Sequence, residues 1–162
     1  MATPTLSIYA DNLDDSTIPD APARKGARAV IVLNDKLVML HLKAINLFTL
    51  PGGGIEPGET PKEALIREVM EETGYEVIDA HETVILKEHF PDSIWHHHFF
   101  FVTVDETRQT ALKLTDEEKR LDSRVIMPTI DEAFKLLDTS KSTHEHGATI
   151  QKREFMGLLN SL

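Results

Sequence analysis

Residues 52–75 read GGGIEPGETPKEALIREVMEETGY and form the most informative segment of the chain. It joins a glycine-rich loop to a short helical segment. Thr60 is the expected N-cap, Pro61 occupies the first helical position, and Glu63 stands where it completes a capping box. Gly74 stands where a helix ends in the left-handed conformation. The sequence therefore predicts a loop, a helix and a second loop in direct succession.

The predicted helix carries two different faces when its residues are placed at about 100° each. Glu71 and Glu72 lie three and four positions after Glu68, so the three carboxylates share one patch, where they repel one another. Such a patch, beside loop carbonyls, suits a hard divalent cation that prefers oxygen ligands. The neighbouring arc is apolar and is expected to face a core. It consists of Leu65, Ile66, Val69 and Met70.

Length and composition describe an ordinary globular chain. Its 162 residues are predicted to form a single domain over 1–162, and 41% of them are hydrophobic and 27% charged. The net charge of −10 argues against a broad nucleic-acid surface or an anionic membrane surface. If the substrate is a polyphosphate, it meets this negative charge, and a divalent cation would reverse the sign of the site locally.

Three features that the sequence lacks limit the expected cellular compartment and the types of metal ligand. The sequence contains no cysteine, which excludes disulfides and thiolate ligands. It shows no long apolar run, so no transmembrane helix is expected. The N-terminus lacks a basic region followed by an apolar one and is not read as a signal peptide. The cytoplasm is the expected location.

The simplest interpretation of three glutamates on a helix, taken alone, is that they form a solvent-exposed acidic face. The spacing of the whole stretch changes this interpretation. Counting from Gly53, five residues precede Glu59, and seven more precede the run REVMEETGY that begins at Arg67. This pattern resembles the Nudix box, G-x5-E-x7-R-E-U-x-E-E-x-G-U, where U is a bulky apolar residue. Every fixed letter matches, and Tyr75 stands where an aliphatic residue is usual.

The alternation of strands with two or three helices predicts an α/β sandwich. The resemblance sharpens this to a Nudix-type α/β/α sandwich with a mixed central sheet, in which the box forms the loop–helix–loop. It also implies hydrolysis of a nucleoside diphosphate linked to another group, with Mg²⁺ or Mn²⁺ as cofactor. Glu68 and Glu72 are the expected metal ligands, completed by Glu71 and the carbonyl of Gly53.

The remaining box residues have expected structural roles. Arg67 is predicted to point away from the centre of the carboxylate patch and to pair with Glu59, which would hold the loop against the helix. Glu56 has no fixed role in the box, and we expect an exposed loop residue.

Candidates outside the box are less sharply defined. The family often recruits a general base there, and Glu117 or Glu118 could serve; we take Glu118 as the catalytic candidate, although a solvated charge is the simpler interpretation. Arg28 belongs to a small basic cluster and is a candidate contact for a substrate phosphate. Phe48, where the family commonly has Trp, is the candidate for stacking on a base, with core packing as its alternative. Phe90 and Trp95 are open to the same two interpretations.

Several strands and helices are expected around the box. Residues 5–9 read as an edge strand, 11–22 as a loop, 27–33 and 37–42 as a hairpin, and 46–50 as a short strand into the box. Strand signals follow in 76–90, and 93–104 read as a central strand. Because side chains alternate along a strand, only His96 and His98 of its three histidines share a face, so packing or a pocket wall is favoured over metal ligation. Residues 107–121 read as a polar, acidic loop. The C-terminal part is expected to contain a strand at 125–127 and helices at 131–137 and 148–159.

Two classes of function remain at this stage. One is a metal-dependent pyrophosphohydrolase acting on a small nucleotide: a nucleoside triphosphate, an oxidised nucleotide, ADP-ribose or a dinucleoside polyphosphate. The other is a non-catalytic Nudix-fold module that binds or senses nucleotides. The retained glutamates favour the enzyme. The residues do not choose among the substrates, and they leave a homodimer open.

Overall fold

The computed structural model describes residues 2–10 and 23–162, so the loop expected at 11–22 lies outside the described residues. Its main sheet follows the order β1-β7-β8-β2-β3, with β6 paired to β2, and a smaller sheet has the order β5-β4-β9. Pairing is mixed, since β2 runs parallel to β8 and antiparallel to β6. The strands are β1 (Thr5–Tyr9), β2 (Ala23–Leu33), β3 (Lys36–Leu37), β4 (Met39–Leu42), β5 (Leu47–Thr49), β6 (Gly52–Gly54), β7 (Tyr75–His89), β8 (Ile94–Gln109) and β9 (Ser123–Ile126).

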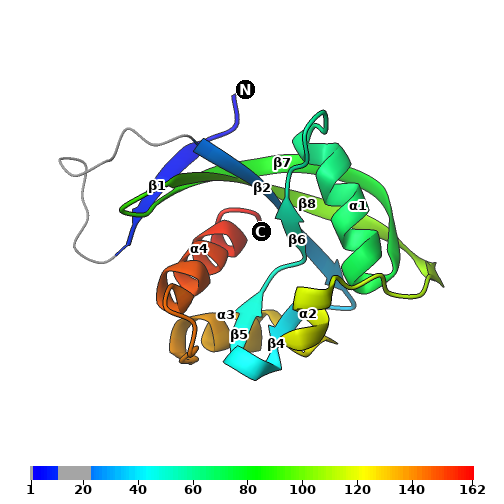
Figure 1. The fold of residues 1–162 in the computed structure, drawn as a ribbon. Helices are drawn as coiled ribbons and strands as arrows, with labels where there is room; N and C mark the ends of the chain where they lie inside the picture. Colours follow the sequence, from blue (N-terminus) through cyan, green and yellow to red (C-terminus); the bar gives the residue numbers. More distant parts are fainter. Residues whose placement is uncertain (1, 11–22) are drawn as a thin grey trace.

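Helices cover both faces of the strongly curved main sheet (Figure 1). One helix, α1, packs against β2, β6 and β7, whereas α3 and α4 pack on the opposite side together with β5. The expected α/β/α arrangement with a mixed central sheet is thereby confirmed. The helices are α1 (Pro61–Thr73), α2 (Asp116–Arg120), α3 (Ile130–Thr139) and α4 (Gly147–Leu159), and a 3-10 turn, η2, spans Lys43–Ile45.

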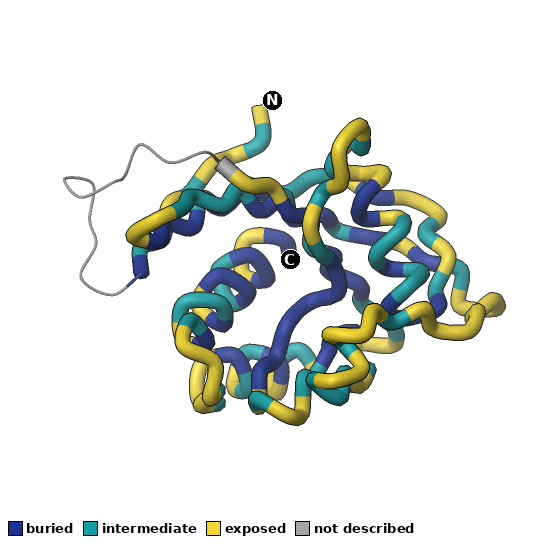
Figure 2. Tube along the Cα trace, in the orientation of Figure 1, coloured by how far each residue is buried: buried dark blue, intermediate teal, exposed yellow. Residues whose placement is uncertain are grey.

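Alternation along β2 divides the interior into two cores. Ala27, Ala29 and Ile31 face α1, whereas Val30 belongs to the core beneath α3 and α4. Arg28, the candidate phosphate contact, therefore lies on the α4 side of the sheet. Residues 47–52 are buried without interruption, and they lead the chain from β5 into the glycine loop (Figure 2).

Most of the expected elements appear, with three corrections. The hairpin turns over Asn34 and Asp35, both with positive φ as a two-residue turn requires, but it pairs only β2 with the two-residue β3, and β4 leaves for the smaller sheet. The strand expected at 93–104 is central, between β7 and β2, and extends to Gln109. The region expected as a polar loop contains α2, which begins with a capping box of Thr115 and Glu118.

Helix α1 begins and ends as its sequence predicts. Thr60 and Glu63 exchange both capping-box hydrogen bonds, and Gly74 has a φ of 79°. The predicted apolar face is only half right, because Leu65 and Val69 are buried, while Ile66 is 37% exposed. The buried arc instead runs through Ala64 and Glu72, since the helix is rotated to carry Glu72 into the interior.

Candidate active site

The glycine loop approaches β2 so closely that side chains are excluded. Gly52 has a φ of 148°, and a Cβ atom there would collide with the carbonyl oxygen of Ala27. A Cβ on Gly53 would lie 2.5 Å from Oε1 of Glu68. The two glycines therefore let the loop backbone lie between the sheet and the carboxylates of α1.

Glu72 is the most buried carboxylate of the box, with 4% of its surface exposed. Its Oε1 accepts a hydrogen bond of 2.9 Å from the backbone nitrogen of Gly52. Burial raises the pKa of Glu72 well above its usual value, and the nearby Glu68 carboxylate raises it further, while Arg28 and the Gly52 hydrogen bond act in the opposite direction. A buried anion beside a second anion is a site that a cation would stabilise.

Arg67 ties the loop to the helix, as predicted. Its Nε and Nη2 donate to the two carboxylate oxygens of Glu59 at 2.8 and 2.9 Å, and Nη2 also donates to the carbonyl of Gly54 at 3.2 Å. These hydrogen bonds lower the pKa of Glu59 to about 2. The expectation that Arg67 avoids the carboxylate patch is wrong, because its Nη1 lies 2.9 Å from Oε1 of Glu68 and 3.5 Å from Oε2 of Glu71. Arg67 is thus a positive charge in direct contact with two carboxylates of the patch.

The structure brings Glu118 to the same carboxylates although it lies 46 residues beyond Glu72 in the chain. Glu118 and Glu72 line one cavity. Burial raises the pKa of Glu118, with a further contribution from the charges of Glu68 and Glu71. One of its oxygens, Oε2, accepts from the backbone nitrogen of Thr115 in the capping box, which fixes the side chain at the start of α2. By contrast, Glu117 pairs with Arg120 on the exposed surface.

The donor set fits a hard divalent cation. Within the described part of the chain, no three His, Cys, Asp or Glu side chains already stand in a metal-binding cluster. The box nevertheless gathers oxygen donors on Glu68, Glu71 and Glu72, and the absence of a side chain on Gly53 keeps the Glu68 carboxylate close to the loop backbone. Oxygen donors of this kind are those that Mg²⁺ and Mn²⁺ prefer.

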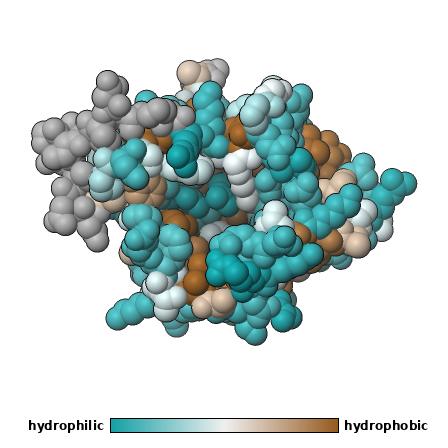
Figure 3. Space-filling view, in the orientation of Figure 1, coloured by the Kyte–Doolittle hydropathy of each residue, from teal (hydrophilic) through white to brown (hydrophobic). Residues whose placement is uncertain are grey.

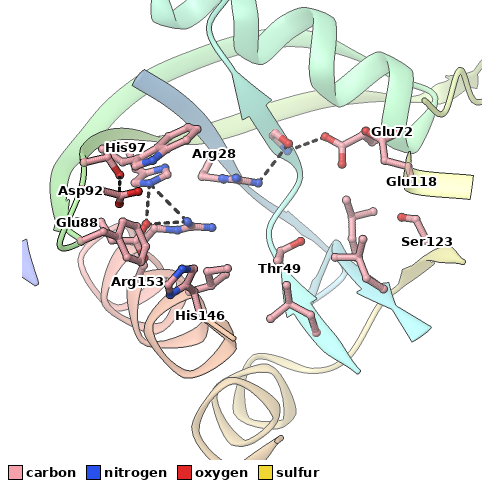
Figure 4. A pocket seen from close by; sticks show the side chains of 18 residues that line it. Arg28, Thr49, Glu72, Glu88, Asp92, His97, Glu118, Ser123, His146 and Arg153 are labelled. Atoms are coloured by element: carbon pink, nitrogen blue, oxygen red, sulfur yellow. Dashed lines mark hydrogen bonds and ion pairs between the residues drawn. The ribbon is translucent and has the colours of Figure 1, made fainter. Parts of the chain in front are cut away.

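A cavity of about 470 Å³ extends from Glu72 and Glu118 toward α4. The space-filling view shows the face hollowed near its middle, with hydrophilic and hydrophobic residues around the hollow (Figure 3). Arg28 lies between its two ends, and its Nη1 donates to the Gly52 carbonyl at 3.2 Å (Figure 4). The cavity is large enough for a nucleoside-sized ligand.

The aromatic candidates divide into two groups. Phe48 is buried in the core below α4 and stacks on His41 with ring centroids 4.1 Å apart. Phe48 does not line the cavity. Its position agrees with core packing, the alternative to stacking on a base. Phe90 and Trp95 do line the cavity, as does His146 at the start of α4.

The far end of the cavity contains charged residues that were not singled out from the sequence. Glu88 and Arg153 are each at least 96% buried, and Nη1 of Arg153 lies 3.1 Å from Oε1 of Glu88. His97 lies 3.1 Å from the same oxygen, and Arg153 also contacts Glu154 at 3.1 Å. One feature of the sequence does indicate this cluster, namely the adjacent charged residues Arg153 and Glu154 in an otherwise amphipathic helix. Charged residues are rarely buried unless they are paired.

Comparisons with known proteins agree with this geometry. The profile of the NUDIX domain matches residues 23–146. A Bacillus subtilis (strain 168) protein with the provisional name 8-oxo-dGTP diphosphatase is 38% identical over 78 residues, which is 46% of this chain and 50% of the relative. An RNA pyrophosphohydrolase of Marinomonas sp. (strain MWYL1) is 35% identical over 69 residues, 41% of each chain. This chain thus spans half or less of these relatives' length.

The fold is shared with solved structures. The crystal structure of a MutT NUDIX hydrolase from Burkholderia pseudomallei superposes with a TM-score of 0.60 at 16% identity, covering 87% of this chain and 99% of the other. A box with all its fixed residues, the sandwich fold and the profile match over most of the chain lead to one conclusion. The chain belongs to the Nudix family. In addition, none of the helices in the described ranges is long and apolar enough to cross a membrane.

Proposed function

We propose that this chain is a divalent-cation-dependent pyrophosphohydrolase that cleaves a nucleoside diphosphate linked to another group, releasing the products by attack of water on phosphorus. The observation that carries this proposal is Glu72. Its carboxylate is buried beside Glu68, its pKa is raised, and it stands at one end of a nucleoside-sized cavity. Burying a carboxylate costs free energy, and a cation bound by Glu72 would offset this cost.

Glu68 and Glu72 would hold the cation, with Glu71 and the Gly53 carbonyl completing the set. When bound, Mg²⁺ or Mn²⁺ neutralises diphosphate charge and lowers the pKa of water. The role of the chain is to keep these donors in place. Gly52 holds Glu72 through its backbone nitrogen, and Arg67 holds the loop against α1.

Two residues outside the box complete the proposed machinery. Glu118 is the proposed general base, because it lies on the cavity wall beside Glu72 and because burial and the charges of Glu68 and Glu71 raise its pKa. Arg28 is the proposed phosphate contact. Its guanidinium lies between the two ends of the cavity, and its buried Nε has no hydrogen-bond partner among the described residues.

The names of the relatives concern 8-oxo-dGTP and the pyrophosphate of RNA, and both reactions cleave the same type of bond. We therefore propose small nucleotides as substrates, with the cytoplasm as the place of action. The single domain over 1–162 and the homodimer left open by the sequence remain predictions. The non-catalytic alternative is disfavoured because the box glutamates are all retained and gathered beside a cavity.

A panel of nucleoside triphosphates, oxidised nucleotides, ADP-ribose and dinucleoside polyphosphates tests the proposal. We expect hydrolysis of at least one compound with Mg²⁺ or Mn²⁺, and none after chelation with EDTA. Hydrolysis that continues after exhaustive chelation would contradict the cation requirement. Tight binding of a nucleotide without turnover under every metal condition would favour the non-catalytic module.

A further inference from the structure

The buried carboxylate of Glu154 takes no part in the proposed reaction, yet it touches two parts of the site. Glu154 lies on α4, is fully buried, and does not line the cavity. Its Oε1 accepts hydrogen bonds from the backbone nitrogen of Leu50 at 3.2 Å and from Nη2 of Arg153 at 3.1 Å. The same oxygen lies 3.8 Å from Nε of Arg28. One atom of α4 therefore contacts both the segment that enters the glycine loop and the candidate phosphate contact.

Another residue of α4 shows what anchoring the backbone alone requires. Gln151 lies one turn before Glu154, and its Oε1 accepts from the backbone nitrogen of Phe48 at 3.4 Å. Phe48 and Leu50 thus donate to two side chains that are three positions apart on one face of α4. A neutral amide is sufficient for the first of these contacts. Accepting from Leu50 therefore gives no reason for a charge at Glu154.

The charge of Glu154 has a reason in the buried cations beside it. Glu88 pairs with Arg153 at 3.1 Å, whereas Glu154 is the carboxylate within ion-pair distance of Arg28 among the residues that the structure describes. Burial and the charge of Arg153 lower the pKa of Arg28, and Glu154 is the strongest of the carboxylates that act in the opposite direction. Glu154 is thus the anion that balances the buried charge of Arg28.

The contacts of Arg28 leave one nitrogen of its guanidinium for a ligand. Nη1 donates to the carbonyls of Gly52 at 3.2 Å and Leu50 at 3.5 Å, and Nε is buried. Nη2 makes no hydrogen bond within the described ranges and is not one of their buried unpaired atoms, so it stays accessible on a residue that lines the cavity. Figure 4 shows this guanidinium between Arg153 and Glu72. Because a guanidinium is planar, fixing Nε and Nη1 also fixes the direction of Nη2.

We propose that Glu154 is a positioning residue, which holds the Arg28 guanidinium and the Leu50 backbone together so that Nη2 of Arg28 is directed at a phosphate group in the cavity. The inference rests on the proposed function, in which Arg28 contacts a substrate phosphate, and it names the residue that sets the direction of this contact. It also connects α4 to the box, because the segment held at Leu50 continues to Gly52, whose nitrogen bonds Glu72.

The orientation of Arg28 is measurable on the unaltered protein, without metal and without turnover. In nitrogen NMR spectra of arginine side chains, a guanidinium that is held on two sides rotates slowly about its Nε–Cζ bond and gives separate Nη1 and Nη2 signals. We expect such a pair for Arg28, assigned through its proximity to the backbone of Gly52. Inorganic pyrophosphate should shift the Nη2 signal of Arg28 more than its Nη1 signal.

Glu154→Gln separates orientation from anchoring. The variant keeps the volume and an acceptor for the Leu50 nitrogen but removes the charge, so the two Nη signals of Arg28 should merge. Loss of a nearby anion favours a bound phosphate and loss of orientation disfavours it, so the Kd of inorganic pyrophosphate should stay within about threefold of the wild type. Because the rate depends on orientation at the reacting centre, kcat should fall about tenfold.

A double-mutant cycle tests whether Glu154 acts through Arg28. Arg28→Lys keeps a positive charge but lacks the planar fork that Glu154 would direct. In the Arg28→Lys background, Glu154→Gln should therefore change kcat by less than about twofold. Gln151→Met is the matched control, because it removes the acceptor for Phe48 from the same face of α4 and Gln151 makes no hydrogen bond to Arg28. Its effect on kcat should be the same in both backgrounds.

Each outcome decides the proposal. Averaged Nη signals for Arg28 in the wild type, or a pyrophosphate shift confined to Nη1, would overturn the positioning role. Equal losses from Glu154→Gln in both backgrounds would do the same, since the carboxylate would then act on the scaffold alone. If Glu154→Gln does not fold, the spectra of the unaltered protein still decide.

The same measurements separate this inference from the proposed reaction. A held Arg28 whose Nη2 responds to pyrophosphate, without turnover of any nucleotide, would refute only the reaction. Turnover with a freely rotating Arg28 would refute only the role of Glu154. Spectra of Arg28 that do not change with pyrophosphate would refute the phosphate contact and, with it, the positioning role.

Discussion

The backbone nitrogen of Gly52 lies 2.9 Å from Oε1 of Glu72, so the first residue of the glycine loop is bonded to the last glutamate of the helix that follows it. The contact fixes one oxygen of a carboxylate that is almost fully buried. Gly52 also links the loop to Arg28, because Nη1 of Arg28 donates to the Gly52 carbonyl. These two hydrogen bonds therefore hold together the glycine loop, helix α1 and Arg28, the candidate contact for a substrate phosphate.

Replacing Glu72 by Gln tests whether the carboxylate serves chemistry or folding. The amide oxygen of Gln can still accept from Gly52, and the repulsion with Glu68 is removed, so the metal-free variant should fold and be no less stable. We expect kcat/KM to fall by at least about 10²-fold, equivalent to about 2.7 kcal/mol of transition-state stabilisation. Steady-state rates and melting curves on the same preparations measure both effects. Near-wild-type activity in the folded variant would show that Glu72 is not a required ligand.

Cation binding should also be visible as stability. Because a cation that binds only the folded carboxylate patch shifts the unfolding equilibrium, Mg²⁺ or Mn²⁺ is expected to raise the Tm of the wild type. The rise should be smaller in Glu72→Gln. Thermal melts across a titration of each cation measure the difference. Equal shifts in the two proteins would place the bound cation elsewhere.

The box could be predicted because its information is local. The cap at Thr60, the end at Gly74 and the pairing of Arg67 with Glu59 all follow from spacing within one short segment. The core face of α1 was predicted less well, since helical periodicity assigns apolar residues inward and gives no reason to bury Glu72. Only the neighbouring loop, whose Gly52 nitrogen meets the carboxylate, explains why that charge lies inside.

The far end of the cavity could not be predicted from spacing. Glu88 and His97 lie on two antiparallel strands, and Arg153 is more than 50 residues further along the chain. Their meeting depends on how α4 packs across the sheet, which no local pattern encodes. The histidine run did indicate opposite faces for neighbouring residues, and the structure places His97 in the pocket wall while His98 pairs with Glu82 away from the cavity.

Arg67→Ala should damage the scaffold and the chemistry together. It removes the bidentate pair with Glu59 and the contact with the Gly54 carbonyl, so the loop loosens. We expect the free energy of unfolding to fall by about 1–2 kcal/mol and the activity to fall with it. Glu63→Ala is the control, because it removes a capping contact worth about 1 kcal/mol or less and should spare kcat/KM. Equal activity losses in both variants would mean that lowered stability alone explains the effect of Arg67.

The Glu59–Arg67 pair predicts a dependence of stability on pH. The pKa of Glu59 is about 2 in the folded protein against an ordinary value of 4.5, so the unfolded chain binds this proton first as pH falls. The stabilisation is therefore complete above about pH 4.5 and is lost progressively toward pH 2. Unfolding free energies measured from pH 6 down to pH 3 should show the advantage of wild type over Glu59→Gln shrinking in this window. A constant difference across the range would show that the ionised carboxylate is not the source of the stabilisation.

Two adjacent glycines give the sharpest test of loop geometry. A Cβ on Gly53 would lie 2.5 Å from Oε1 and 2.6 Å from Cδ of Glu68, whereas a Cβ on Gly54 would have no heavy atom of the described residues within 4 Å. Neither residue has the positive φ that penalises alanine. In Gly53→Ala the Glu68 carboxylate must move, and a displacement of about 1 Å at a catalytic group costs about 10²-fold in rate. Because this carboxylate is the end of a flexible side chain, it can move without unfolding the helix, so stability should change by about 1 kcal/mol or less. Gly54→Ala should match the wild type in both kcat/KM and Tm. If the two alanine variants have the same activity, the close approach of Gly53 to Glu68 is not required for the reaction.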